Sequence, residues 1–102
     1  MKHMIATAAL MAAITTSPVY AEGYTYMCRV PSDHRSYPVR VDIDNATLTW
    51  RGRTFRNLQE VEGCRVKWQA TSEGATAELC TATKGVADLK IGDASFDCQL
   101  VR

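Results

Sequence analysis

Apolar and polar residues alternate along most of this chain with a period of two. From Tyr24 to Val30 every second residue is tyrosine, cysteine or valine, and similar alternation returns in later segments. Because side chains on a strand point to opposite faces in turn, this period is typical of strands with one buried face. The pattern predicts about eight short strands, at residues 24–30, 39–43, 46–50, 54–57, 64–70, 75–79, 86–91 and 96–101.

Short polar stretches between these segments predict hairpin turns. Asp44 and Asn45 both tolerate positive φ, and Gly52 before Arg53 suits a type II′ turn. Aligning apolar faces across each turn then predicts the register of each hairpin. The predicted turns are 44–45, 52–53, 72–74 and 92–95, and the predicted partners are Val39 with Trp50, Val41 with Leu48, Trp50 with Phe55, Val66 with Leu79, Trp68 with Ala77, and Leu89 with Cys98.

The alternation breaks once, after Asn57. Leu58 is out of phase with Phe55, and residues 59–63 are mainly polar, which fits a strand end, a bulge or a connecting loop. Beyond the N-terminal segment no stretch has the period of a helix. The pattern therefore predicts an all-β fold, a small antiparallel up-and-down β-barrel of about eight strands or a small sandwich. The barrel is favoured because closure leaves no exposed strand edge.

The N-terminal segment has the organisation of a secretory signal peptide. Residues 1–3 are basic, residues 4–14 are almost entirely apolar but too few to span a bilayer, and residues 19–21 fit a small-residue cleavage site. We expect residues 1–21 to be a signal peptide and residues 22–102 to form a single domain, exported to the periplasm or secreted. No stable membrane insertion is expected once the signal peptide has been removed.

Four cysteines follow the signal peptide, namely Cys28, Cys64, Cys80 and Cys98. An even number in a short exported chain predicts two disulfides, and their wide spacing disfavours a zinc site. Spacing alone allows three pairings. Since Cys28 and Cys98 share the apolar phase of the first and last strands, which are neighbours in a closed barrel, we expect Cys28–Cys98 and Cys64–Cys80.

The charge of the expected mature chain is balanced, because eleven basic residues remain beside eleven acidic ones when Lys2 is removed. Zero net charge argues against nucleic acid as a partner, although the alternation of arginine and aromatic residues at 50–56 has a faint likeness to single-strand binding surfaces. The expected domain has one histidine, His34, in a polar loop, and no nucleophile motif. We therefore expect no enzymatic activity, no cofactor and no metal.

Three short motifs resemble the MliC/PliC-type inhibitors of c-type lysozyme. Residues 26–28 resemble the early Tyr-x-Cys of that family, residues 83–89 resemble its Lys-Gly stretch, and Cys98 resembles its closing cysteine. The resemblance implies an exported eight-stranded barrel whose loops enter the lysozyme cleft. It implies that Lys84, between Thr83 and Gly85, contacts the catalytic carboxylates.

The same resemblance implies a second contact at Glu62 and Gly63, where the family has a Ser-Gly motif. Glutamate stands here in place of serine, so a structural or ligand-binding barrel without lysozyme affinity is the alternative hypothesis. For either hypothesis we expect a monomer or weak dimer. The expected partner under the first hypothesis is c-type lysozyme.

Overall fold

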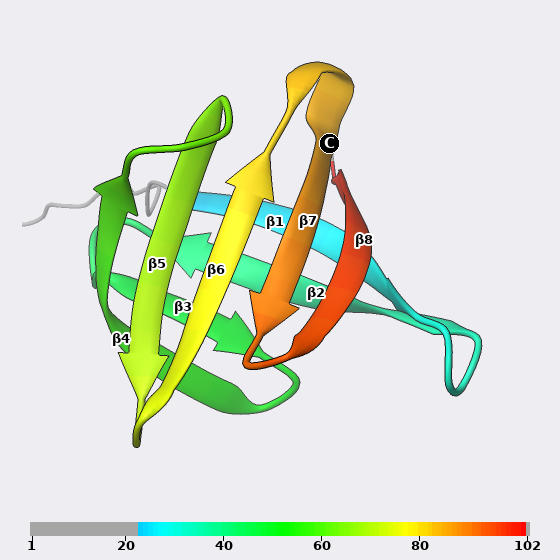
Figure 1. Ribbon diagram of the computed structural model, residues 1–102, viewed down its shortest axis with the longest axis horizontal. Coiled ribbons are helices and arrows are strands. Elements are labelled where there is room, and N and C mark those ends of the chain that lie inside the picture. The colour runs from blue at the N-terminus through cyan, green and yellow to red at the C-terminus, as the bar shows by residue number, and fades with distance from the viewer. Residues whose placement is uncertain (1–22, 102) are drawn as a thin grey trace, which may run out of the picture.

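The computed structural model describes residues 23–101, which form eight strands (Figure 1). The predicted signal peptide, residues 1–21, lies outside the described residues, as do both end residues of the predicted domain. The strands are β1 (Gly23–Val30), β2 (Arg35–Asp42), β3 (Thr47–Trp50), β4 (Arg53–Val61), β5 (Val66–Ser72), β6 (Ala75–Thr81), β7 (Val86–Ile91) and β8 (Ala94–Leu100).

Each strand pairs antiparallel with the strands before and after it, and β1 pairs with β8 to close the sheet. In Figure 1, β5 to β8 cross in front of β1 to β3, so the sheet wraps around one interior. The predicted all-β, up-and-down barrel is confirmed. Since successive strands run in opposite directions, alternate connections lie at the same end of the barrel.

The interior holds the apolar residues that the period of two selects. Phe55, Leu48, Leu79 and Leu89 are fully buried near its centre. Burial of this apolar surface is the main favourable contribution to folding. The remaining core residues are Tyr26, Cys28, Val30, Val39, Val41, Trp50, Ala70, Ala77, Ala87 and Cys98.

The register of the β2–β3 hairpin is as predicted, with Val41 opposite Leu48 and Val39 opposite Trp50. The next register is wrong, because Phe55 lies opposite Leu48 and not Trp50. The turn consists of Arg51 and Gly52, both at positive φ, so the predicted type II′ turn at 52–53 does not form. Positive φ at both central residues is the requirement of a type I′ turn.

Two later registers are wrong by two residues in the same way. Leu79 lies opposite Trp68 and not Val66, and Leu89 lies opposite Phe96 and not Cys98. A slip of two keeps each side chain on its predicted face, so the apolar pattern could not detect it. The turns of these two hairpins have two residues each, 73–74 and 92–93, and are shorter than the predicted turns at 72–74 and 92–95, which accounts for the shifted registers.

The break in phase after Asn57 is a bulge inside β4. Asn57 has a φ of 59°, and the register with β5 shifts between Arg56 and Gln59. The amide of Leu58 donates to the carbonyl of Ala46 at 3.0 Å, so the chain stays attached to its neighbour through the bulge. Of the three readings that the sequence allows, the bulge is therefore confirmed, and residues 59–61 continue the strand.

Both expected disulfides are present. Cys28 and Cys98 are direct partners on β1 and β8, and their bridge spans 70 residues of sequence. Cys64 lies just before β5 and bridges to Cys80 on β6 across 16 residues. The first bridge therefore joins the two strands whose pairing closes the barrel.

An aromatic cluster fills one end of the barrel. Trp50 is only 7% exposed and packs against Phe96 and, edge to face, against Tyr37. The guanidinium of Arg51 lies over the Tyr37 ring at 4.1 Å from its centroid, and the Tyr37 hydroxyl donates to the Asp33 carboxylate. Trp50 and Phe55 are thus core residues.

We expect loss of the Cys28–Cys98 bridge to destabilise the fold substantially. A cross-link over a loop this long restricts the unfolded chain, and the expected loss for a Cys28→Ala/Cys98→Ala variant is about 4 kcal/mol in the free energy of unfolding. Urea denaturation measures it. Removal of Cys64–Cys80, which closes a shorter loop, should cost about 3 kcal/mol. Unchanged stability of the first variant would contradict the role assigned to this bridge.

Hydrogen bonding from Tyr37 lowers the pKa of the Asp33 carboxyl below its ordinary value, aided by the backbone amide of Arg35. A lowered folded pKa means that the ionised carboxylate contributes stability above its ordinary pKa and loses it as the pH falls. Tyr37→Phe should raise the pKa of Asp33, which carboxyl-carbon NMR titration can follow. An identical Asp33 titration in wild type and variant would refute the contact, with Tyr24→Phe as the control.

Candidate functional site

All five residues that the resemblance singles out lie at one end of the barrel. Glu62 and Gly63 belong to the β4–β5 connection, and the β6–β7 connection contains a 3₁₀ turn at Thr83–Gly85. Both connections appear at the top of Figure 1, and the β6–β7 connection lies near the end of β8. We call this end, formed by the connections 43–46, 62–65 and 82–85, the mouth. The aromatic cluster fills the opposite end.

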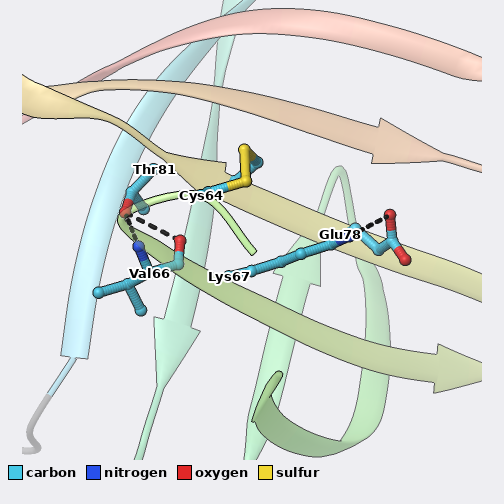
Figure 2. Close-up of a disulfide and its surroundings, with 6 residues drawn as sticks. Cys64, Val66, Lys67, Glu78 and Thr81 are labelled. Carbon is cyan, nitrogen blue, oxygen red and sulfur yellow. Dashed lines mark hydrogen bonds and ion pairs between the residues drawn. A yellow bond between two sulfur atoms is a disulfide. The ribbon is translucent and has the colours of Figure 1, made fainter. Parts of the chain in front are cut away.

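Thr81 joins the two connections to each other. Its hydroxyl accepts a hydrogen bond from the Val66 amide at 3.0 Å and donates one to the Val66 carbonyl at 2.9 Å (Figure 2). Its backbone carbonyl accepts a further bond from the Arg65 amide at 3.0 Å. Thr81 is 8% exposed, so these bonds are largely shielded from water. A buried polar side chain with its partners satisfied fixes the geometry around it.

The Cys64–Cys80 disulfide holds the β4–β5 connection against β6 beside Thr81 (Figure 2). Gly63, next to the bridge, has a φ of +129°, a backbone conformation that favours glycine. A Cβ at this position would also lie 3.2 Å from Lys67 Cδ. The path of the loop therefore depends on glycine at residue 63.

Lys67 and Glu78 form an ion pair on the outer faces of β5 and β6, with Nζ and Oε1 3.7 Å apart. Gln69 donates to the other carboxylate oxygen of Glu78 at 2.9 Å. Both charged side chains are about a quarter exposed, so the pair contributes little, roughly 0–1 kcal/mol. The pair connects the outer faces of β5 and β6.

The β6–β7 connection is a closed, short turn. The Ala82 amide donates to the Val86 carbonyl at 2.7 Å, and the Val86 amide donates back to the Thr83 carbonyl. Lys84 and Gly85 have φ values of 64° and 75°, both in the left-handed region. Lys84 is exposed, and its ammonium makes no hydrogen bond or ion pair with another residue of 23–101.

A cavity of about 630 Å³ opens at the mouth, beneath the turn that carries Lys84. Its apolar wall comes from strands on several sides of the barrel, and its polar residues lie on the β4–β5 and β6–β7 segments. The apolar lining residues are Tyr24, Tyr26, Ile43, Val66, Trp68 and Leu100. The charged lining residues are Glu60, Arg65 and Lys84.

The bulge in β4 explains why a carboxylate lines this cavity. Beyond Asn57 the strand changes phase, and Glu60 lies opposite Trp68, which belongs to the inward-facing set. Burial, and to a smaller degree the nearby Tyr24, raises the pKa of the Tyr26 hydroxyl. Tyr26 lines the cavity, and its phenol is neutral at ordinary pH.

Sequence reasoning identified Lys84 and its neighbours only through the resemblance, and it did not identify the cavity. The period of two places Trp68 on the apolar face of its strand, and in the structure it is half buried and lines the cavity. The sequence feature that points to the cavity is Glu60. If a bulge is placed at Asn57, this charged residue falls on the inward-facing side of its strand. Tyr24, 46% exposed, gives no comparable signal.

Among residues 23–101 no group of three or more histidine, cysteine or acidic side chains could hold a metal ion. His34 is exposed in the β1–β2 turn, at the end of the barrel opposite the mouth. In the same part of the chain no helix is long and apolar enough to cross a membrane.

Comparison with known proteins finds no matching family model, no matching curated protein and no matching solved structure.

Proposed function

We propose that this chain is an exported binding protein that inhibits c-type lysozyme by inserting Lys84 into the enzyme's cleft. The observation that carries the proposal is the position of Lys84, exposed at the mouth on a closed turn and without a partner among residues 23–101. The resemblance of residues 83–89 to the inhibitor family supplies the partner. Two disulfides agree with an oxidising compartment, as an exported protein requires.

The chemistry of such inhibition is a charge-assisted hydrogen bond. A lysozyme hydrolyses its substrate with two carboxyl groups on either side of the scissile bond. An ammonium that reaches them in a partly dehydrated cleft gains a stronger hydrogen bond than in water, and it excludes the sugar from the same space. Lys84 is suited to this role because no internal carboxylate among residues 23–101 neutralises it.

Rigidity of the turn supports the proposal as well. Binding through a mobile loop loses affinity to the cost of ordering it. The turn at Lys84 is closed by the two backbone hydrogen bonds of Ala82 and Val86, and β6 below it is fixed by the Cys64–Cys80 disulfide. Little ordering is then required when the loop meets a partner.

The position of Glu62 and Gly63 at the same mouth supports a second contact. The hydrogen bond from Arg65 to Thr81 places the β4–β5 connection directly beside the segment that leads to Lys84. A partner that contacts Lys84 would therefore also approach Glu62. Since Glu62 carries a negative charge, it would weaken binding to a cleft that is itself lined by carboxylates.

Lys84→Ala should weaken inhibition by roughly ten- to a hundredfold, because a hydrogen bond between charged groups contributes about 1.5–3 kcal/mol. The measurement is the inhibition constant of the exported protein against c-type lysozyme on bacterial cell wall. Lys90→Ala is the matched control, since Lys90 is exposed on β7 near the opposite end.

Full lysozyme activity at micromolar excess of the wild-type protein would overturn the proposal. So would equal loss of inhibition in the Lys84 and Lys90 variants, because that result would reflect net charge and not a specific contact.

Glu62→Ser should strengthen inhibition several-fold, because it removes a like charge that faces the lysozyme carboxylates. The inhibition constant is again the measurement, at low and at high salt. The gain should shrink as salt screens the repulsion. Asp93→Ser removes the same charge at an exposed turn of the opposite end and should leave the inhibition constant unchanged. Weaker inhibition by the Glu62 variant would argue against this placement of the cleft.

A further inference from the structure

The two ends of the barrel are filled differently. At one end Tyr37, Trp50 and Phe96 pack together, with ring centroids 6.3 Å and 5.2 Å apart, and leave Trp50 almost fully buried. At the mouth the interior instead opens into the cavity of about 630 Å³. This volume lies within the range of small-molecule sites, and the mouths of eight-stranded barrels are common places for them.

The wall of this cavity is largely apolar and aromatic. Tyr26 and Leu100 face each other across β1 and β8, and Trp68 lies on β5. Trp68 and Leu100 are both only half buried. Because burying apolar surface away from water is favourable, an apolar occupant would be stabilised here.

The rim of the cavity carries more positive than negative charge. Lys84 and Arg65 contribute two cations, and Glu60 contributes one carboxylate. None of the three side chains makes an ion pair or hydrogen bond within the described part of the chain. An anionic group at the rim would therefore gain two partners and be opposed by one, whereas a cationic group would meet the reverse.

We propose that the mouth binds a small amphipathic organic anion, whose apolar body lies against Trp68 and Leu100 and whose acidic head lies between Lys84 and Arg65. A medium-chain carboxylate has this chemistry. A fully polar ligand would leave the apolar wall exposed to water. An uncharged ligand would leave Lys84 and Arg65 without an anionic partner.

This site goes beyond lysozyme inhibition and does not rest on it. The apolar body of the ligand occupies the interior of the mouth, whereas lysozyme would approach from outside, and Lys84 is the residue that both proposals use. Binding of the small anion is measured without any lysozyme present, so a failure of either proposal leaves the other intact.

The test is a titration of the exported, disulfide-bonded protein with decanoate, in which binding is measured by calorimetry. A Trp50→Phe variant leaves Trp68 as the only tryptophan of residues 23–101, so its fluorescence reports on the cavity alone. We expect saturable binding that changes the emission of Trp68. Decan-1-ol and decylamine, which share the apolar body but lack the anionic head, should bind more weakly.

Three variants test the placement of the head group. Arg65→Ala should weaken decanoate binding and Glu60→Gln should strengthen it, each by roughly two- to fivefold as expected for exposed charges. Lys90→Ala, outside this cavity, should have no effect. The proposal is overturned by absence of saturable binding at millimolar decanoate in protein whose circular dichroism is that of the folded barrel. Equal affinities for decanoate and decylamine, or no response to both rim variants, would overturn it equally.

Discussion

Pairing between the first and last strands closes this barrel, and it is the interaction on which the other features depend. The described pairing of β1 with β8 comprises four residue pairs, from Tyr26 with Leu100 to Arg29 with Asp97. Cys28 and Cys98 form one of these pairs and join it covalently. A domain of about eighty residues buries too little apolar surface to be robust without such a cross-link. Closure also removes the two strand edges that an open sheet would expose.

Closure has a functional consequence, because the up-and-down order of the closed barrel determines which connections lie at the same end. In an up-and-down barrel every second connection lies on the same side, so 62–65 and 82–85 come together at the mouth. Thr81 and the Cys64–Cys80 bridge then fix these two segments to each other. The result is a stiff rim that holds a free ammonium, which is the feature that both an enzyme cleft and an anionic ligand could use.

Much of the fold could be predicted from the sequence, because a period of two assigns side chains to faces with little ambiguity. The predicted partner of Leu79 is Val66, whereas its actual partner is Trp68, since a slip of two residues preserves the faces. The conformation of the turn determines the register of a hairpin. In two of these turns Arg51 and Glu73 adopt positive φ, each directly before a glycine. Non-glycine residues rarely do so, and the sequence gives no local reason to expect it at these two.

The candidate site could be predicted in part. Lys84 follows from a short resemblance. The Cys28–Cys98 disulfide follows from the phase of its cysteines within the first and last strands, and Cys64–Cys80 is then the pair that remains. The cavity could not be predicted, because it depends on how far side chains from opposite strands fill the interior. The bulge at Asn57, which turns Glu60 inward, is visible in the sequence only as a break in phase.

The most direct test of this account is solution NMR of the closing strand pair. In a closed barrel the α-protons of Tyr26 and Leu100 face each other across β1 and β8, and a strong nuclear Overhauser contact between them is expected. The contact should persist when Cys28 and Cys98 are replaced by alanine under conditions where the variant remains folded. If contacts between Leu89 of β7 and Phe96 of β8 are observed while the Tyr26–Leu100 contact is missing in the wild-type protein, the sheet is open and the account is wrong.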